Sequence, residues 1–252
     1  MKTKFIIGTS GWNYPAWKSS FYPKDIPQKR WLEYYENHFD IVELNATFYR
    51  LFEKKVFVTW RKRARKNFKY IVKVNRYITH IKHLKNCRAA IKKFLRRVAV
   101  LEDKLAMMLL QLPPNMPYDI KRLRSALLAF DDPSKVIVEF RDKKWFTDEV
   151  QDLLTELNVT FCIADSPTID LINCVTSKTA YIRMHGRTIW FNYNYSKAEL
   201  QEVARFARKL AKQGTNKIYI MFNNDYYAYA VRNAQYLQSL LNKSSVNKPN
   251  LT

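Results

Sequence analysis

The chain has 252 residues, of which 47% are hydrophobic, so it can bury a full core within a single domain. Its three cysteines share no CxxC spacing, which argues against a disulfide framework and a zinc site, and no apolar run approaches the roughly 20 residues of a membrane helix. The 44 Lys and Arg residues outnumber the 22 Asp and Glu residues, and the resulting formal charge of +22 attracts polyanions and steers anionic ligands.

Eight short aliphatic or β-branched runs predict β-strands. In chain order they occupy residues 5–8, 41–44, 70–74, 105–110, 135–140, 160–164, 180–184 and 217–222. A stretch with helical periodicity follows each strand except the sixth, after which the connection is short. Within residues 87–101, the apolar side chains share one face of the predicted helix: Ile91, Phe94, Leu95 and Val98. Thr147 stands where it would cap another helix.

The alternation of strands and helices predicts a parallel sheet. An open, doubly wound sheet is the competing arrangement, but the Gly-rich turn at residues 8–11 lacks the GxGxxG spacing that such sheets use. The sequence therefore predicts an α/β protein with a single (β/α)8 TIM-like barrel, whose helix after strand six is irregular or missing. We expect this domain over residues 1–241 and a polar, flexible tail over residues 242–252.

Polar residues stand at or just beyond the C-terminal ends of these strands. A closed parallel barrel brings those ends to one face, where such folds build their active sites. Alternate residues of a strand point the same way, so several charged side chains are expected to share one rim. Crowded charges shift one another's pKa values, as acid–base catalysis requires. The candidate catalytic residues are Glu43, Lys73, Glu139, Asp165 and His185.

Lys73 admits more than one role. A Schiff-base role is open to a desolvated amine, but we expect the surrounding carboxylates to hold this lysine charged. We therefore interpret it as an electrostatic clamp for a carboxylate or phosphate group. A structural ion pair with Glu43 on the neighbouring strand is the alternative, and the whole rim has a matching alternative, an ion-pair network that merely fills a wide barrel mouth.

The same connections carry further polar and aromatic residues. Flat aromatic faces beside Arg and Lys suit sugar rings or nucleobases, although long loops also pack down with aromatic residues. The candidate substrate-binding residues are Trp12, Asn45, Tyr49, Arg76, His80, Gln111, Arg141, Trp145, Arg183, Asn223 and Asn224.

No cofactor is expected. Glu43, Glu139, Asp165 and His185 include enough oxygen ligands for a divalent metal, but the neighbouring Lys and Arg side chains would repel the ion. A divalent metal is therefore the less favoured alternative.

Motifs at the strand ends resemble the YecE-like family, also called domain of unknown function 72. The similar segments are GTSGWNY at residues 8–14, VELNATFYR at 42–50, THIK at 79–82, QLPP at 111–114, EFR at 139–141 with WF at 145–146, ADSP at 164–167, RMHGR at 183–187 and FNND at 222–225. This resemblance implies a TIM-like barrel with a pocket lined by these segments, without an established reaction. Tyr226, Tyr227 and Tyr229 stand where the family tends to carry small residues, so we expect the eighth loop to narrow the pocket.

Three functions are consistent with these features. The favoured one is an enzyme, a hydrolase or lyase, that binds a small phosphate- or carboxylate-bearing substrate at the C-terminal face of the barrel. The first alternative is a protein that binds or processes nucleic acid through its basic surface and aromatic loops. The second is a non-catalytic scaffold for a partner. The apolar segment after Met1 is too short for a signal peptide, so we expect a cytoplasmic protein without a membrane partner.

Overall fold

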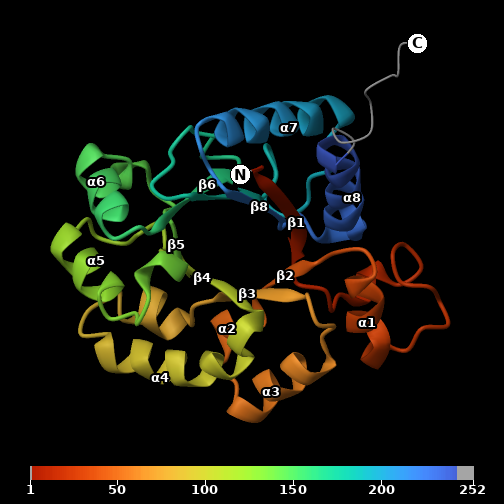
Figure 1. Cartoon of the computed structure of the whole chain (residues 1–252), viewed down its shortest axis with the longest axis horizontal. Coiled ribbons are helices and arrows are strands. Elements are labelled where there is room, and N and C mark those ends of the chain that lie inside the picture. Colours follow the sequence, from red (N-terminus) through yellow and green to blue (C-terminus); the bar gives the residue numbers. More distant parts are fainter. Residues whose placement is uncertain (1, 243–252) are drawn as a thin grey trace.

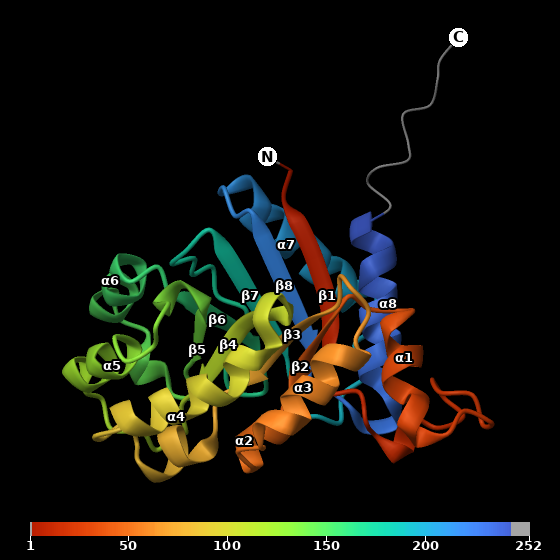
Figure 2. The same ribbon diagram turned by 60° about the horizontal axis from the view of Figure 1, so that its bottom comes forward.

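The computed structural model describes residues 2–242 and contains a closed barrel of eight parallel strands (Figure 1). The strands are β1 (Lys4–Ser10), β2 (Ile41–Leu44), β3 (Lys69–Lys73), β4 (Leu105–Gln111), β5 (Val136–Glu139), β6 (Thr160–Asp165), β7 (Thr179–Met184) and β8 (Lys217–Phe222). Each strand pairs with its neighbours in sequence, and β1 closes the barrel against β8, beside which it runs in Figure 2. The predicted single TIM-like barrel is confirmed.

Helices surround the barrel on its outer side (Figures 1 and 2). They are α1 (Trp31–Glu36), α2 (Ala46–Tyr49), α3 (Lys54–Arg63), α4 (Arg88–Val98), α5 (Ile120–Leu127), α6 (Asp148–Glu156), α7 (Lys197–Lys212) and α8 (Tyr229–Asn242). Residues 166–178, between β6 and β7, contain no helix, as predicted. Helix α8 ends at Asn242, and the remainder of the predicted tail, residues 243–252, lies outside the described residues.

The helices cover the barrel with one apolar face each. In α4, the predicted stripe of Ile91, Phe94, Leu95 and Val98 is buried. The Thr147 side chain caps α6 by accepting a hydrogen bond from the backbone N–H of Val150, as the sequence predicts. These contacts fix the helices against the outside of the sheet and leave the strand ends of one face open.

The barrel interior is built in layers. A cluster of buried apolar residues fills the lower layers of the interior: Ile41, Ile71, Met107, Leu109, Ile137, Cys162, Tyr181, Tyr219 and Met221. Because side chains two residues apart point to the same side of a strand, the next inward positions on four of these strands lie one layer closer to the C-terminal face. Those positions hold Glu43, Lys73, Glu139 and Arg183. The apolar layers thus close the barrel beneath a layer of charges.

Candidate functional site

A cavity of about 1140 Å³ lies above this charged layer, among the C-terminal ends of the strands. Many residues predicted from the sequence line it: Asn45, Tyr49, Lys73, Arg76, His80, Gln111, Arg141, Arg183 and Asn223. Other lining residues were not among the predicted candidates: Tyr14, Phe48, Pro114, Thr168, Trp190, Phe191, Asp225 and Tyr226. The aromatic connections after β1, β2 and β7 carried a signal for Tyr14, Phe48 and Trp190, whereas nothing in the local sequence singled out Thr168.

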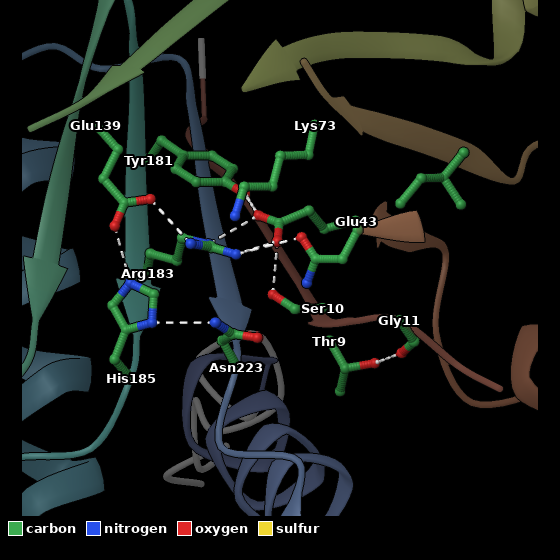
Figure 3. Close-up of polar contacts among 12 residues, drawn as sticks. Thr9, Ser10, Gly11, Glu43, Lys73, Glu139, Tyr181, Arg183, His185 and Asn223 are labelled. Atoms are coloured by element: carbon green, nitrogen blue, oxygen red, sulfur yellow. Dashed lines mark hydrogen bonds and ion pairs between the residues drawn. The ribbon is translucent and has the colours of Figure 1, made fainter. Parts of the chain in front are cut away.

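Arg183 lies between two carboxylates at the floor of the cavity (Figure 3). Its Nη2 donates to Glu43 Oε1 at 2.6 Å and its Nε donates to Glu43 Oε2 at 3.1 Å. Its Nη1 donates to Glu139 Oε2 at 2.9 Å. All three side chains are inaccessible to solvent. A guanidinium with this fork geometry neutralises buried carboxylates more effectively than an ammonium would.

Glu43 is held ionised by its neighbours. Burial alone would raise the pKa of this carboxyl, but the charge and hydrogen bonds of Arg183 lower it below the usual range. The hydroxyl of Ser10 donates to Oε1 at 2.7 Å, and the Tyr181 hydroxyl donates to Oε2. Every oxygen of Glu43 is therefore engaged before any ligand arrives.

Glu139, His185 and Asn223 form a chain beside Arg183 (Figure 3). His185 Nε2 lies 3.0 Å from Glu139 Oε1, and Asn223 Nδ2 lies 3.1 Å from His185 Nδ1. Burial, followed by the charge of Arg141, lowers the pKa of His185 well below its usual range, so the ring is neutral. With its proton on Nε2, the neutral ring donates to Glu139 and accepts from Asn223 at Nδ1; Arg141 Nη2, which can only donate, also lies 3.2 Å from Nε2.

Arg141 forms the side of the cavity next to this chain. Its Nε lies 2.7 Å from Glu139 Oε1, and its guanidinium lies 4.6 Å from the centre of the Trp190 ring. Burial alone would raise the pKa of Glu139, but Arg141 and Arg183 together hold it well below the usual range. Glu139 is thus shared between two arginines.

Lys73 differs from the arginines because its amine has no anionic partner. The side chain is 8% exposed, and Nζ lies 4.3 Å from the centre of the Phe48 ring. Among residues 2–242, no hydrogen bond or ion pair reaches this amine. Burial, and then the charge of Arg183, lower the pKa of Lys73 to about 7.

The alternative ion pair of Lys73 with Glu43 is not formed, because Arg183 occupies both oxygens of that carboxylate. The nearby carboxylates favour the charged form of Lys73, but burial and the two arginines lower its pKa to about 7, so the amine is only partly charged at neutral pH.

His80 brings a second neutral imidazole to the cavity. It lies on a π-helical turn, Tyr77–Ile81, and its ring centre is 4.8 Å from that of Phe48. Burial, followed by the charge of Lys73, lowers the pKa of His80 to about 4. Single π-helical turns are frequent at functional sites.

Seven predicted residues do not line the cavity. Three of them, Glu43, Glu139 and His185, belong to the buried network around Arg183. The other four lie elsewhere. Asp165 accepts a hydrogen bond from Arg187 Nε at 3.2 Å, and Asn224 donates to the carbonyl of Tyr193 at 2.7 Å. Each of these residues comes directly after a residue whose side chain faces inward, so its own side chain points away from the barrel interior. Trp145 is buried in a stack with Phe140, and Trp12 packs edge-on against Trp60.

Neither a metal cluster nor a membrane span is found in the part of the chain that the structure describes. No three His, Cys, Asp or Glu side chains within residues 2–242 gather closely enough to hold a metal ion. Within the same residues, no helix has the length and apolar character needed to cross a membrane.

Known proteins are similar to this chain in sequence. The UPF0759 protein YunF of Bacillus subtilis (strain 168) is 24% identical over 277 residues, which cover 93% of this chain and 94% of YunF. The UPF0759 protein YecE of Escherichia coli (strain K12) is 29% identical over 141 residues, which cover 56% of this chain and 49% of YecE. This alignment therefore spans about half the length of YecE.

Solved structures of other proteins have a similar fold. A DUF72 family protein from Thermotoga maritima MSB8 superposes with a TM-score of 0.83 at 27% identity, covering 94% of this chain and 99% of that one. A DUF72 family protein from Enterococcus faecalis V583 superposes with a TM-score of 0.79 at 21% identity, covering 96% and 98% of the two chains, and shows the fold alone. The family model described as protein of unknown function DUF72 matches residues 6–251, so the chain belongs to the DUF72, or YecE-like, family.

Proposed function

We propose that this protein is an enzyme that binds a small substrate with a phosphate or carboxylate group in the cavity at the C-terminal face of the barrel. The observation that carries this proposal is the unpaired amine of Lys73. It is almost fully buried, and it lines the cavity. A buried ammonium without a partner is unfavourable, so an anionic ligand at this position would gain a strong interaction.

The charges around Lys73 support an anionic ligand. The inner cluster contains three cationic side chains, Lys73, Arg141 and Arg183, against two carboxylates, Glu43 and Glu139. When Lys73 is protonated, this buried cluster therefore carries one excess positive charge. Arg76 and Asp225, which carry opposite charges, also line the cavity and leave this balance unchanged. A bound anion would balance the excess and raise the pKa of Lys73.

The remainder of the lining suits a substrate with polar and flat parts. Asn45, Gln111 and Asn223 supply amide donors and acceptors, while Phe48 and Trp190 supply ring faces. Lys73, with a pKa of about 7, could both accept and donate a proton near neutral pH. Acid–base chemistry on the bound anion is therefore the mechanism that we propose, as a hydrolase or lyase would use.

The proposal is tested by thermal denaturation with inorganic phosphate, glycerol 3-phosphate and citrate at fixed ionic strength. Lys73→Met removes the unpaired cation, and Lys93→Met on α4 is the matched control. We expect at least one anion to raise the Tm of the parent protein and of Lys93→Met by several degrees more than that of Lys73→Met. Equal shifts in all three proteins would reflect general salt effects and would overturn the proposal.

Exposed tyrosines favour nucleic-acid binding as a second candidate function. Tyr49 is 72% exposed and Tyr226 is 54% exposed, and both line the mouth of the cavity. Together with the formal charge of +22, such rings could stack on the bases of a single strand. Fluorescence anisotropy with a labelled oligonucleotide should show affinity that falls steeply with salt and is weakened in Tyr49→Ala. Undetectable or salt-independent binding would remove this candidate.

A further inference from the structure

Two lysines of this chain are buried to a similar extent, but their amines differ in the hydrogen bonds that they make. Lys104 is 7% exposed, and its amine donates to the backbone carbonyls of Ala64, Arg65 and Lys66 at 3.0, 2.5 and 3.4 Å. Lys73 is 8% exposed, and no described residue between 2 and 242 accepts a hydrogen bond from its amine. The three carbonyl groups stabilise the charged form of Lys104, whereas no hydrogen-bond acceptor within residues 2–242 does so for Lys73.

The surroundings of Lys73 instead favour a neutral amine with a free lone pair. Burial and the charges of Arg183 and Arg141 favour the neutral form, and they outweigh the attraction of the Phe48 ring face, 4.3 Å from Nζ, and of the two carboxylates for the ammonium. Burial lowers the pKa of Lys73 to about 7, so a substantial fraction of the amine is unprotonated at neutral pH. A desolvated, unprotonated lysine is a nucleophile.

The cavity provides room for an electrophile next to this amine. Lys73 is the last residue of β3, so its side chain enters the cavity from the strand end where barrel enzymes carry out their chemistry. Arg141 and Arg76 line the same cavity and offer positive charge to a second group of the ligand. An anionic compound with a separate reactive carbon would satisfy both features.

From this placement, we infer that Lys73 forms a covalent imine with the carbonyl carbon of an anionic aldehyde or ketone, such as a 2-oxo acid or a phosphorylated carbonyl compound. This inference rests on the proposed function: Lys73 in its charged form and the arginines together attract the anionic group, and the arginines hold it while the unprotonated fraction of Lys73 reacts. It adds the substrate class and a covalent step at a named atom.

The step balances without an oxidant or a reductant. The lone pair of Lys73 Nζ forms a bond to the carbonyl carbon, and the π electrons of the carbonyl move to its oxygen, which takes up a proton. The resulting carbinolamine loses its oxygen together with two hydrogens as one molecule of water, leaving a C=N bond to Nζ. The two amine hydrogens and the carbonyl oxygen account for that water.

The other nucleophiles of the described chain are poorer candidates. Burial raises the pKa of the thiols of Cys87, Cys162 and Cys174, which suppresses the reactive thiolate. Cys162 is also part of the apolar layers beneath the charged floor. The thiols therefore do not compete with Lys73 for a carbonyl in the cavity.

Reductive trapping tests the inference. The full chain is incubated at neutral pH with pyruvate, dihydroxyacetone phosphate or propanal in the presence of sodium cyanoborohydride, and the modified lysines are mapped by mass spectrometry. Ordinary lysine amines are less than roughly 0.1% neutral at pH 7, so we expect Lys73 to be modified at least about tenfold faster than any other lysine by one of the anionic compounds. The Lys104→Arg control should retain this adduct, and Lys73→Arg should lose it.

The outcomes separate the inference from the proposed function. Selective modification of Lys73 by an anionic carbonyl compound, slowed by excess phosphate, supports both. Modification by propanal alone, without competition from phosphate, would overturn the anionic substrate and the proposed function. Phosphate binding that depends on Lys73, with no adduct on Lys73 from any compound, would overturn the imine and leave the proposed function standing. An adduct spread evenly over many lysines would also overturn the imine.

Discussion

Arg183 binds Glu43 in a two-pronged ion pair, with Nη2 at 2.6 Å from Oε1 and Nε at 3.1 Å from Oε2, and solvent reaches neither side chain. This pair joins β7 to β2 across the interior of the barrel. Because Arg183 also binds Glu139, it consumes the negative charge that would otherwise neutralise Lys73. The proposed reactivity of Lys73 thus originates in the partners of Arg183.

Removing Arg183 should destabilise the fold strongly. Arg183→Met leaves Glu43 and Glu139 buried without their main partner, and breaking one side of a buried ion pair typically costs about 3 to 5 kcal/mol. The surface pair Arg63–Glu33 is the control, since Arg63→Met should change the free energy of unfolding by about 1 kcal/mol or less. Urea denaturation measures both, and equal losses would contradict the account.

Lys73 should make stability depend on pH in alkaline solution. Its pKa is lowered from 10.5 to about 7 in the folded state, so between these values the unfolded chain binds a proton that the folded chain lacks. The free energy of unfolding therefore rises with pH in this window, by a few kcal/mol in all, since one pKa unit corresponds to about 1.4 kcal/mol. Urea denaturation at neutral and alkaline pH should show this rise in the parent protein relative to Lys73→Met. If the difference in the free energy of unfolding between the parent protein and Lys73→Met stays the same at neutral and alkaline pH, the pKa of Lys73 is not lowered.

His185 should remain neutral in mildly acidic solution. Its pKa lies well below 6.5 because the ring is buried and close to Arg141, and its Nε2 faces Glu139. Nitrogen NMR of the imidazole at pH 6 should show one protonated nitrogen, Nε2, and one acceptor nitrogen, Nδ1. A doubly protonated ring at that pH is the opposite result. In Asn223→Leu the Nδ1 signal should shift, because Nδ1 loses its hydrogen bond.

Trp145 should contribute to stability but not to ligand binding. It is 1% exposed and stacks on Phe140 with ring centres 5.2 Å apart, outside the residues that line the cavity. Trp145→Leu should therefore lower the free energy of unfolding by about 1 to 3 kcal/mol and leave the phosphate-induced Tm shift unchanged. Loss of that shift in a folded variant would place Trp145 in the site after all.

The strand pattern was sufficient to predict which face of the barrel holds the cavity. Period-two alternation on β2, β3, β5 and β7 correctly placed Glu43, Lys73, Glu139 and Arg183 on the inside. The same alternation also explains Asp165 and Asn224, because each lies one position out of phase with an inward residue. Counting from the inward-facing Cys162 would have turned Asp165 away from the cavity.

The partners of these side chains could not be predicted locally. Arg183 and Glu43 are separated by 140 residues, and they meet because the barrel closes at one particular stagger of its strands. A local reading pairs Lys73 with Glu43, since their strands are neighbours. Arg183 pairs with Glu43 in place of Lys73 because its guanidinium forms two hydrogen bonds to Glu43 and a third to Glu139.

The most direct test of the account is the pKa of Lys73 itself. Its side-chain nitrogen can be titrated by NMR, or its amine can be followed by competitive acetylation as the pH is raised, with Lys104→Arg as the control for the other buried lysine. The account predicts a transition near pH 7 in the free protein that moves upward when phosphate binds. A transition near the ordinary value of 10.5, unaffected by phosphate, would contradict it.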